Sequence, residues 1–275
     1  MSKIQKIVEQ DIGDSDDVRK ILSAYNGLDS LAPFEYTAFG PNDGDDDEMG
    51  VKAEVMTGSR LKSASTNKTQ GEWLYKLACF AARECPSMLN IVELGTAAGI
   101  SGMYLLAGAS EESEKLKLFT FEGSPELAEV ATRNLSKITS SKETGKCDFE
   151  IVLGNFDEVV EQFFSSFPEK VGLALIDGNH REDATLAYHR ILRQVMSPCG
   201  IIVHDDINWS KGMRKAWYEI KQLEGAGRTV ELYLGNQATR GIVFLDENPE
   251  GESAKFHLDS PLERIARQLK RALLG

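Results

Sequence analysis

The sequence predicts an α/β fold in which a doubly wound, mostly parallel sheet is covered by helices. From Ile91 to Leu245, short β-branched apolar runs alternate with longer amphipathic stretches. Glycine, serine, proline or acidic residues stand at the junctions between them. Regular alternation of strand-like and helix-like segments is typical of β-α-β units and therefore of a parallel sheet.

Seven strands and five helices are expected in this region. The strands are predicted from Ile91, over Leu116–Phe121, Phe149–Leu153 and Val171–Ile176, from Gly200, and over Val230–Leu234 and Gly241–Leu245. The helices are predicted at Ser101–Ala109, Pro125–Lys137, Phe156–Phe164, Asp183–Met196 and Lys211–Glu224. A short polar link with Gly235 separates the last two strands, which predicts an antiparallel hairpin.

The segments before and after this core are expected to be additions. We divide the chain into an N-terminal helical extension (1–88), the α/β core (89–246) and a C-terminal amphipathic helix (247–275). In the extension we expect helices at Ser15–Tyr25 and Gln70–Arg83, a solvated acidic loop at Pro41–Gly50, and a mobile loop at Thr57–Thr69. That last loop is either a lid over a ligand or an ordinary surface loop.

Composition points to a soluble, cytoplasmic enzyme. A chain of 275 residues is long enough to bury a sizeable core. The formal net charge of −12 argues against generic nucleic-acid binding, which needs basic surfaces. The N-terminus lacks an apolar signal region and no long apolar run suggests a membrane span. The scattered Cys79, Cys85, Cys147 and Cys199 are expected to be buried thiols in a reducing compartment.

The most informative motif is the turn Gly95–Gly99, which follows the apolar strand ending at Glu93 and precedes a helix. Glycines at such a turn let a ligand approach the backbone, and ligands of open α/β sheets bind at the carboxyl ends of strands. The spacing lacks the G-x-G-x-x-G pattern of dinucleotide-binding proteins, which disfavours a dinucleotide oxidoreductase. An ordinary strand-to-helix turn is the alternative.

A second acidic residue, Glu122, ends the next strand and precedes a helix that begins with Ser124 and Pro125. An acidic residue in this place commonly binds ribose hydroxyls. A solvated carboxylate stabilised by the helix dipole is the alternative. Together with the glycine turn, Glu122 indicates a nucleoside-containing cofactor.

Three further carboxylates follow two later strands. Asp177 ends one strand, and Asp205 and Asp206 end the next, 28 residues after Asp177. Neighbouring parallel strands would bring all three to one edge of the sheet. Carboxylates so close repel one another, and a divalent cation such as Mg²⁺, which prefers oxygen ligands, removes the conflict. Alternatively, Asp177 caps a helix and one of the other two meets a lysine.

These motifs, VELGTAAGIS, FEGSPELAEVATRNL and DGNH, resemble the class I S-adenosylmethionine-dependent methyltransferases. The chain is similar to their cation-dependent O-methyltransferase branch, both catechol-type and macrocin-type sugar enzymes. The resemblance implies a Rossmann-like seven-stranded sheet with an antiparallel last strand. It implies a cofactor site formed by Glu93, Gly95, Thr96, Ala97, Gly99, Ser101, Glu122, Asn155, Phe156, Asp157 and Asp177. It also implies metal ligands at Asp177, Asp205 and Asp206.

The resemblance further implies that His180 is the general base. Histidine is the side chain best suited to accept a proton near neutral pH, and His180 follows Asp177 by three residues. Two alternatives stay open: His180 orients a metal ligand, or it is a surface histidine. We assign no role to His189 or His257, and His204 either lines the site or lies inside a strand. Trp209 is either a wall of the acceptor site or a core residue.

The sequence therefore predicts a Mg²⁺-dependent methyltransferase acting on a hydroxyl of a small molecule such as a sugar, a catechol or a polyketide. A binding or regulatory protein that lost catalysis, and a metal-independent methyltransferase, are the alternatives. The segment from Ser260 predicts a capped helix with Leu262, Ile265, Leu269 and Leu273 on one face. This helix either docks on its own core or forms a homodimer, which is our expectation.

Overall fold

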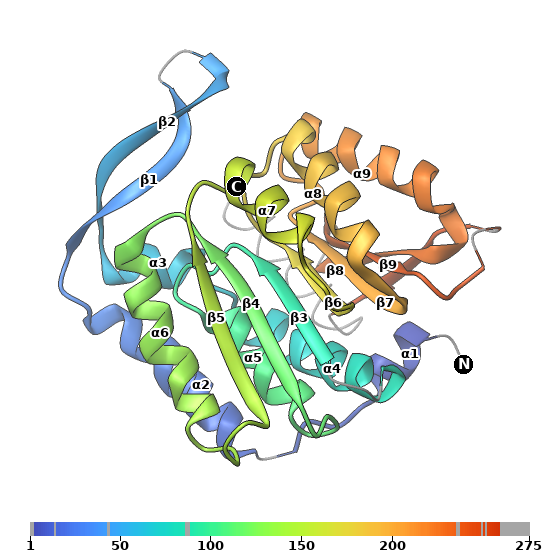
Figure 1. Cartoon of the computed structure of the whole chain (residues 1–275), viewed down its shortest axis with the longest axis horizontal. Helices are drawn as coiled ribbons and strands as arrows, with labels where there is room; N and C mark the ends of the chain where they lie inside the picture. The colour runs from blue at the N-terminus through green and yellow to red at the C-terminus, as the bar shows by residue number, and fades with distance from the viewer. Residues whose placement is uncertain are drawn as a thin grey trace, which may run out of the picture.

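The computed structural model describes residues 3–13, 15–42, 45–85, 89–234, 237–248, 250 and 252–258. A central sheet is sandwiched between two layers of helices, and a separate two-stranded hairpin extends from the body (Figure 1). The α/β fold with a mostly parallel sheet is confirmed.

Within the described residues the central sheet has eight strands in the order β10-β8-β9-β7-β6-β3-β4-β5. They are β3 (Leu89–Leu94), β4 (Leu116–Glu122), β5 (Cys147–Leu153), β6 (Val171–Ile176), β7 (Met196–Asp205), β8 (Thr229–Leu234), β9 (Gln237–Phe244) and β10 (Ala254–His257). As expected, β9 runs antiparallel to both of its neighbours, β7 and β8. The eighth strand, β10, pairs parallel to β8 and was not anticipated.

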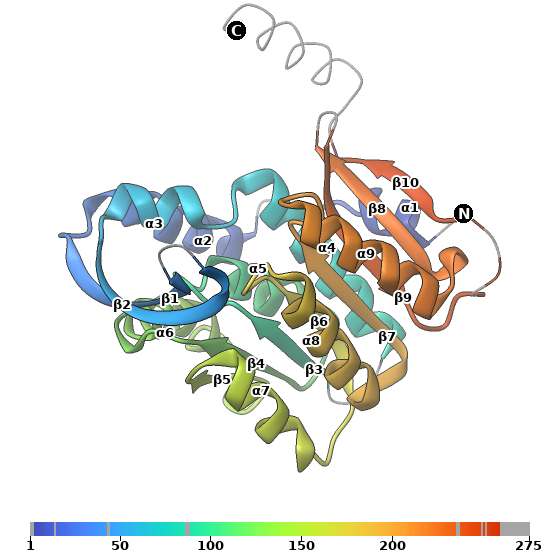
Figure 2. The same ribbon diagram turned by 90° about the horizontal axis from the view of Figure 1, so that it is seen from above.

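Helices cover both faces of this sheet, as Figures 1 and 2 show. One layer contains α4 (Lys68–Glu84), α5 (Ile100–Ala109) and α6 (Pro125–Thr139), with α1 (Lys3–Val8) and α2 (Asp16–Gly27) packed outside it. The other contains α7 (Phe156–Ser165), α8 (Glu182–Val195) and α9 (Lys211–Glu224). Each layer buries its own apolar cluster against the sheet. The helices predicted from periodicity in the core all occur, with ends shifted by at most two residues.

The sheet reverses its winding direction between β3 and β6. The chain passes from β3 outward through β4 to β5, and then returns to place β6 on the other side of β3. The connections after β3 and β6 therefore leave toward opposite faces, which opens a crevice at the carboxyl ends of these two strands. The glycine turn and Asp177 both stand at this crevice.

The N-terminal extension differs from the prediction in two places. The expected acidic loop at Pro41–Gly50 is wrong, because β1 (Phe34–Asn42) and β2 (Asp45–Met56) form an antiparallel hairpin. Acidic residues can stand in a pair of hydrogen-bonded strands as well as in a loop. An interpretation based on charge alone does not distinguish the two.

The expected loop at Thr57–Thr69 is also wrong, since it contains α3 (Gly58–Ala64) and the start of α4. Polar side chains here cap helices. Thr57 Oγ1 accepts a hydrogen bond from Arg60 N at 3.2 Å, and Asn67 Oδ1 accepts one from Gln70 N at 3.1 Å. The Ser/Thr/Asn composition therefore encodes two helix starts.

The cysteines do not all behave as expected. A disulfide joins Cys85, just after α4, to Cys199 on β7, so the prediction of four free thiols is wrong for this pair. The two cysteines are 114 residues apart in sequence, and only the packing of α4 near β7 brings them together. Cys79 and Cys147 are buried free thiols.

At the C-terminal side, β10 occupies part of the segment 247–275, for which only a helix was expected. The predicted helix from Ser260 and the homodimer inferred from it fall outside the described residues. No helix in the described part of the chain is long and apolar enough to cross a membrane.

Candidate active site

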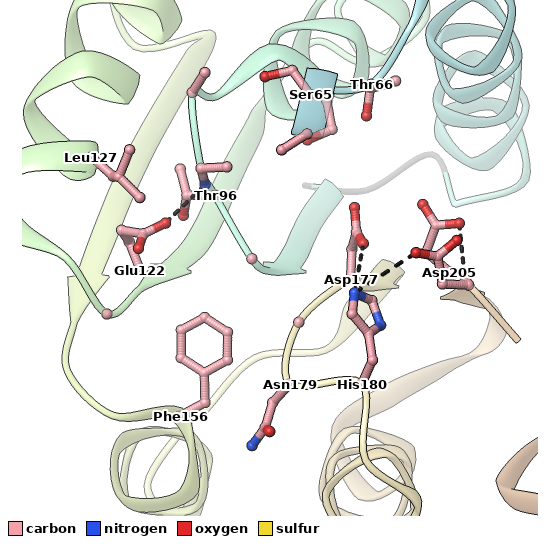
Figure 3. Close-up of a pocket in the computed structure, with 18 of the residues that line it drawn as sticks. Ser65, Thr66, Thr96, Glu122, Leu127, Phe156, Asp177, Asn179, His180 and Asp205 are labelled. Atoms are coloured by element: carbon pink, nitrogen blue, oxygen red, sulfur yellow. Dashed lines mark hydrogen bonds and ion pairs between the residues drawn. The ribbon is translucent and has the colours of Figure 1, made fainter. Parts of the chain in front are cut away.

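A cavity of about 1070 Å³ lies at the carboxyl edge of the sheet, over β3, β6 and β7. Figure 3 shows Glu122 and Phe156 at one end and Asp177, His180 and Asp205 at the other, with Ser65 and Thr66 across the opening. The residues predicted for the site that line this cavity are Gly95, Thr96, Ala97, Ser101, Glu122, Asn155, Phe156, Asp177, His180, Asp205 and Asp206. The fold thus gathers residues from five separate loops around one volume.

Three of the predicted cofactor residues are not among the described residues that line the cavity: Glu93, Gly99 and Asp157. Gly99, with φ +74°, stands at the N-cap position of α5 and packs closely against Ala131. The Asp157 carboxylate accepts hydrogen bonds from Asn179 Nδ2 at 3.1 Å and from the Tyr188 hydroxyl. Both residues hold the walls of the site together and do not face its interior.

Glu93 is buried beneath the glycine turn. Its Oε2 accepts a hydrogen bond from Thr120 Oγ1 at 2.7 Å, whereas Oε1 has no partner among the described residues. Burial raises the pKa of this carboxyl group to about 7, although hydrogen bonds from Ser101 and Thr120 oppose the shift. Glu93 therefore supports the glycine turn from inside the protein and does not line the cavity.

The turn itself requires glycine at position 95. Gly95 has φ +109°, and a Cβ atom there would lie 2.0 Å from the carbonyl oxygen of Asp177. The two strand ends are consequently in backbone contact, and Asp177 N donates a hydrogen bond to Leu94 O at 2.9 Å. This contact fixes the distance between the glycine turn and the acidic cluster.

Glu122 is held rigidly at the other end of the cavity. Its Oε2 accepts a hydrogen bond from Ala97 N at 2.8 Å, and its Oε1 accepts one from Ser124 N at 2.9 Å. Burial raises the pKa of Glu122, and these backbone donors partly offset the rise. Ser124 caps α6, as predicted, by accepting from Leu127 N at 3.3 Å. Each carboxylate oxygen keeps a lone pair that can accept a bond from a ligand hydroxyl.

At the opposite end, Asp177 and Asp206 approach the same imidazole. His180 Nε2 lies 3.8 Å from Asp177 Oδ1 and 4.0 Å from Asp206 Oδ2. Among the described residues no hydrogen bond is donated to the side-chain oxygens of Asp177 or Asp206, and the His180 ring lies close to both carboxylates. Burial and the charge of Asp205 raise the pKa of Asp177 well above its ordinary value, and the same two causes raise that of Asp206.

Backbone strain is concentrated at this edge. Ala97, Asn179 and Asp206 are the described non-glycine residues with positive φ, at +45°, +51° and +49°. They follow β3, β6 and β7 respectively. Such conformations cost free energy and are found most often where a site must be held in one geometry.

Arg240 is the site residue that the sequence analysis missed. It stands on β9 directly opposite Asp205 on β7, and Arg240 Nη2 donates to Asp205 Oδ2 at 2.8 Å. Asp205 Oδ1 accepts from Asp206 N at 2.9 Å. An arginine just before the second strand of a predicted antiparallel hairpin was a usable signal, because that position faces the end of the neighbouring strand.

The N-terminal extension also supplies residues that the sequence analysis did not assign to the site. They come from α2, from β1 and from the α3–α4 connection, and are Tyr25, Tyr36, Thr37, Ala38, Ser63, Ala64, Ser65, Thr66, Asn67 and Gln70. The segment expected as a possible lid thus lines the cavity, through the end of α3, the three-residue connection 65–67 and the start of α4.

Two uncertain assignments are resolved. Trp209 is 73% exposed and lines the cavity, with its ring centroid 6.3 Å from that of His180, so the core interpretation is wrong. His204 is a buried strand residue, and its Nε2 lies 3.2 Å from Nδ1 of His189. Ser210 caps α9 by accepting from Met213 N at 3.0 Å.

Among the described residues, the structure contains no group of three or more His, Cys, Asp or Glu side chains that could hold a metal ion. The acidic cluster nevertheless offers suitable donors: two carboxylates without hydrogen bonds, on adjacent strand ends, at the wall of a cavity. Oxygen donors of this kind suit a hard divalent cation, which would relieve the repulsion that raises their pKa.

Comparisons with known proteins identify the type of domain and the fold of the core. Residues 92–207 match a family model described as a methyltransferase domain, and no curated protein matches the chain. The fold is similar to an O-methyltransferase from Bacillus cereus in complex with SAH, with a TM-score of 0.57, 18% identity and coverage of 87% of this chain and 96% of that one.

Two further solved structures are similar at 14% identity. TomG of Streptomyces achromogenes, an O-methyltransferase involved in tomaymycin synthesis and solved with SAM, has a TM-score of 0.54 and coverage of 84% of this chain and 91% of its own. CalS11, a TDP-rhamnose 3'-O-methyltransferase, has a TM-score of 0.52 and coverage of 86% and 99%. At this identity the likeness establishes the fold.

Proposed function

We propose that this chain, which carries a methyltransferase domain and has the class I S-adenosylmethionine-dependent methyltransferase fold, methylates a hydroxyl group of a small molecule with the help of a divalent cation. The observation that carries the proposal is the arrangement of one cavity. A rigid carboxylate and a glycine turn lie at one end, and an imidazole between two carboxylates lies at the other.

The cofactor fits the first end. Glu122 has both oxygens fixed by backbone donors and faces the cavity, which suits recognition of the ribose hydroxyls (Figure 3). The Phe156 ring lies on the same side and packs on Gly178, where a Cβ atom would lie 2.6 Å from the ring. That surface suits one face of an adenine. Gly95 and Thr96 then line the space between Glu122 and Asp177 for the amino-acid part of the cofactor.

The proposed methyl transfer takes place at the second end of the cavity, beside the acidic cluster. S-adenosylmethionine would supply the methyl group from its sulfonium, and Asp177, Asp205 and Asp206 would hold a divalent cation whose positive charge would lower the pKa of the acceptor hydroxyl. His180 Nε2 faces the same volume and accepts the proton of the acceptor hydroxyl. Trp209 provides an exposed aromatic wall beside His180 on which an acceptor ring can pack.

The cofactor assignment is tested by calorimetry with S-adenosylhomocysteine. Glu122→Ala should weaken binding by about 1.5–3 kcal/mol, because hydrogen bonds to a carboxylate are lost. The matched control is Glu129→Ala, which removes an exposed glutamate on the outer face of α6. Equal affinity in the two variants, or no binding to the native protein, would contradict the assignment.

The reaction is tested by mass spectrometry of products from a panel of sugars, vicinal diols and catechols. We expect a mass gain of one methyl group, loss of turnover with EDTA and recovery with Mg²⁺. Full turnover in EDTA would indicate a metal-independent methyltransferase. Tight cofactor binding without any product across the panel would favour a binding protein that lost catalysis.

A further inference from the structure

Arg240 is a buried cation to which the proposed reaction assigns no role. Its side chain is 1% exposed and lies in the wall of the cavity beside the acidic cluster. Besides Asp205, the guanidinium contacts the carbonyl oxygen of Gln70, to which Nη1 donates at 3.3 Å. The Trp73 ring lies 5.8 Å from its central carbon. These contacts, from β7 and the first two turns of α4, fix the positive charge in place.

Burying the charged side chain of Arg240 costs free energy, which other interactions in the folded protein must offset. A buried charge is tolerated only when it is paired and hydrogen-bonded, and Arg240 Nε has no partner among the described residues. The sheet does not require an arginine here, because β9 pairs with β7 through backbone groups. The nearby charge that offsets the cost is the carboxylate of Asp205.

The charges of the cluster can be added. Asp177, Asp205 and Asp206 carry three negative charges when ionised, and Arg240 lowers the total to two. A divalent ion then balances the cluster, whereas a trivalent ion leaves an excess positive charge. Without Arg240 the net charge of the cluster would be three negative, which would favour the trivalent ion.

We propose that Arg240 is a positioning residue that holds Asp205 in place and acts as the fixed counter-charge that matches the acidic cluster to a divalent cation. The inference rests on the cation site of the proposed function. It adds to that function a reason for the choice of ionic charge, which the three carboxylates alone do not supply.

The test measures ion selectivity, because electrostatic energy scales with the charge of the ion. At unchanged ligand geometry, removing one positive charge strengthens the binding of a trivalent ion more than that of a divalent ion. The measured quantity is therefore the ratio of the association constants for Tb³⁺ and Mn²⁺. Both are obtained at one pH and salt concentration, by calorimetry and by competition against terbium luminescence.

Four variants separate charge from structure. Arg240→Met removes the positive charge, and the Tb³⁺/Mn²⁺ ratio should rise about tenfold or more. Asp205→Asn removes a negative charge, and the ratio should fall by a similar factor. The double variant Asp205→Asn/Arg240→Met keeps the net charge at two negative and should return the ratio to within about threefold of the native value. Arg240→Lys keeps the charge and should leave the ratio unchanged.

Arg193→Met is the matched control. It removes an arginine that pairs with Glu224, and neither residue is among the described residues that line the cavity. This variant should not alter the Tb³⁺/Mn²⁺ ratio. Binding of S-adenosylhomocysteine checks that each variant is folded. If Arg240→Met does not fold, the double variant and Asp205→Asn still decide the question, because they must differ in the ratio.

An unchanged ratio in Arg240→Met, or equal ratios in Asp205→Asn and the double variant, would overturn the role of Arg240 while leaving the cation site intact. A native protein that binds S-adenosylhomocysteine but neither ion would overturn the cation site, and the inference about Arg240 with it.

Discussion

Replacing Glu93 by glutamine should change how stability depends on pH. Glu93 is fully buried under the glycine turn, and its pKa is raised from 4.5 to about 7 in the folded protein. The folded state therefore holds a proton on this carboxyl group between these two values, where the unfolded chain has already lost it.

The sign and size of the effect follow from this difference. Because the folded state binds more protons in the window, the free energy of unfolding falls as the pH rises from about 4.5 to about 7. A shift from 4.5 to about 7, at 1.36 kcal/mol per pKa unit, corresponds to about 3 kcal/mol. Glu93→Gln is permanently neutral and similar in shape, so it should lack this loss.

Urea unfolding at several pH values between 4 and 8 measures the effect. We expect Glu93→Gln and the native protein to be equally stable near pH 4, and the variant to be more stable at pH 8 by up to about 3 kcal/mol. Glu129→Gln, at an exposed position on α6, controls for the loss of one negative charge. Parallel stability profiles for Glu93→Gln and the native protein would refute the reasoning.

Three other outcomes are expected. Gly95→Ala should lower the affinity for S-adenosylhomocysteine at least tenfold in calorimetry, because the new Cβ meets the Asp177 carbonyl at 2.0 Å and φ is +109°; Gly27→Ala, where a Cβ meets nothing within 4 Å, should leave the affinity unchanged. His180→Ala should lower kcat by about 10²–10⁴-fold at saturating Mg²⁺ with little change in cofactor affinity, and a near-normal kcat would reject its role as the base. Asn134→Ala should lower the free energy of unfolding by about 1–3 kcal/mol in urea, because the buried Ala98 carbonyl loses the bond that Asn134 Nδ2 donates at 2.9 Å; an unchanged midpoint would show that this bond does not stabilise the turn.

Much of the core could be predicted from the sequence because its signals are local. Apolar periodicity placed the helices, and Ser124 marked a helix start that the structure confirms through its capping bond. The polar residues at strand ends were informative for the same reason. In a parallel sheet the carboxyl ends of strands meet at one edge, so the position of Asp177 and Asp205 along the chain also fixed their place in the fold.

The N-terminal extension was harder to interpret because its signals are ambiguous. The acidic composition around Pro41–Gly50 is equally compatible with a solvated loop and with an exposed hairpin, and only pairing of β1 with β2 decides between them. The Ser/Thr-rich segment that begins at Thr57 is compatible with a loop and with helix caps. Tertiary contacts of α3 and α4 favour the caps.

By itself, the sequence determined the α/β fold and the residues at its carboxyl edge, because chain order and periodicity encode both. Only the tertiary structure decided which side chains face the cavity. Glu93 lies under the turn, Trp209 is exposed, and Arg240 meets Asp205 across an antiparallel strand pair. Those outcomes depend on contacts between segments that are distant in sequence. Such contacts form only after the strands have paired.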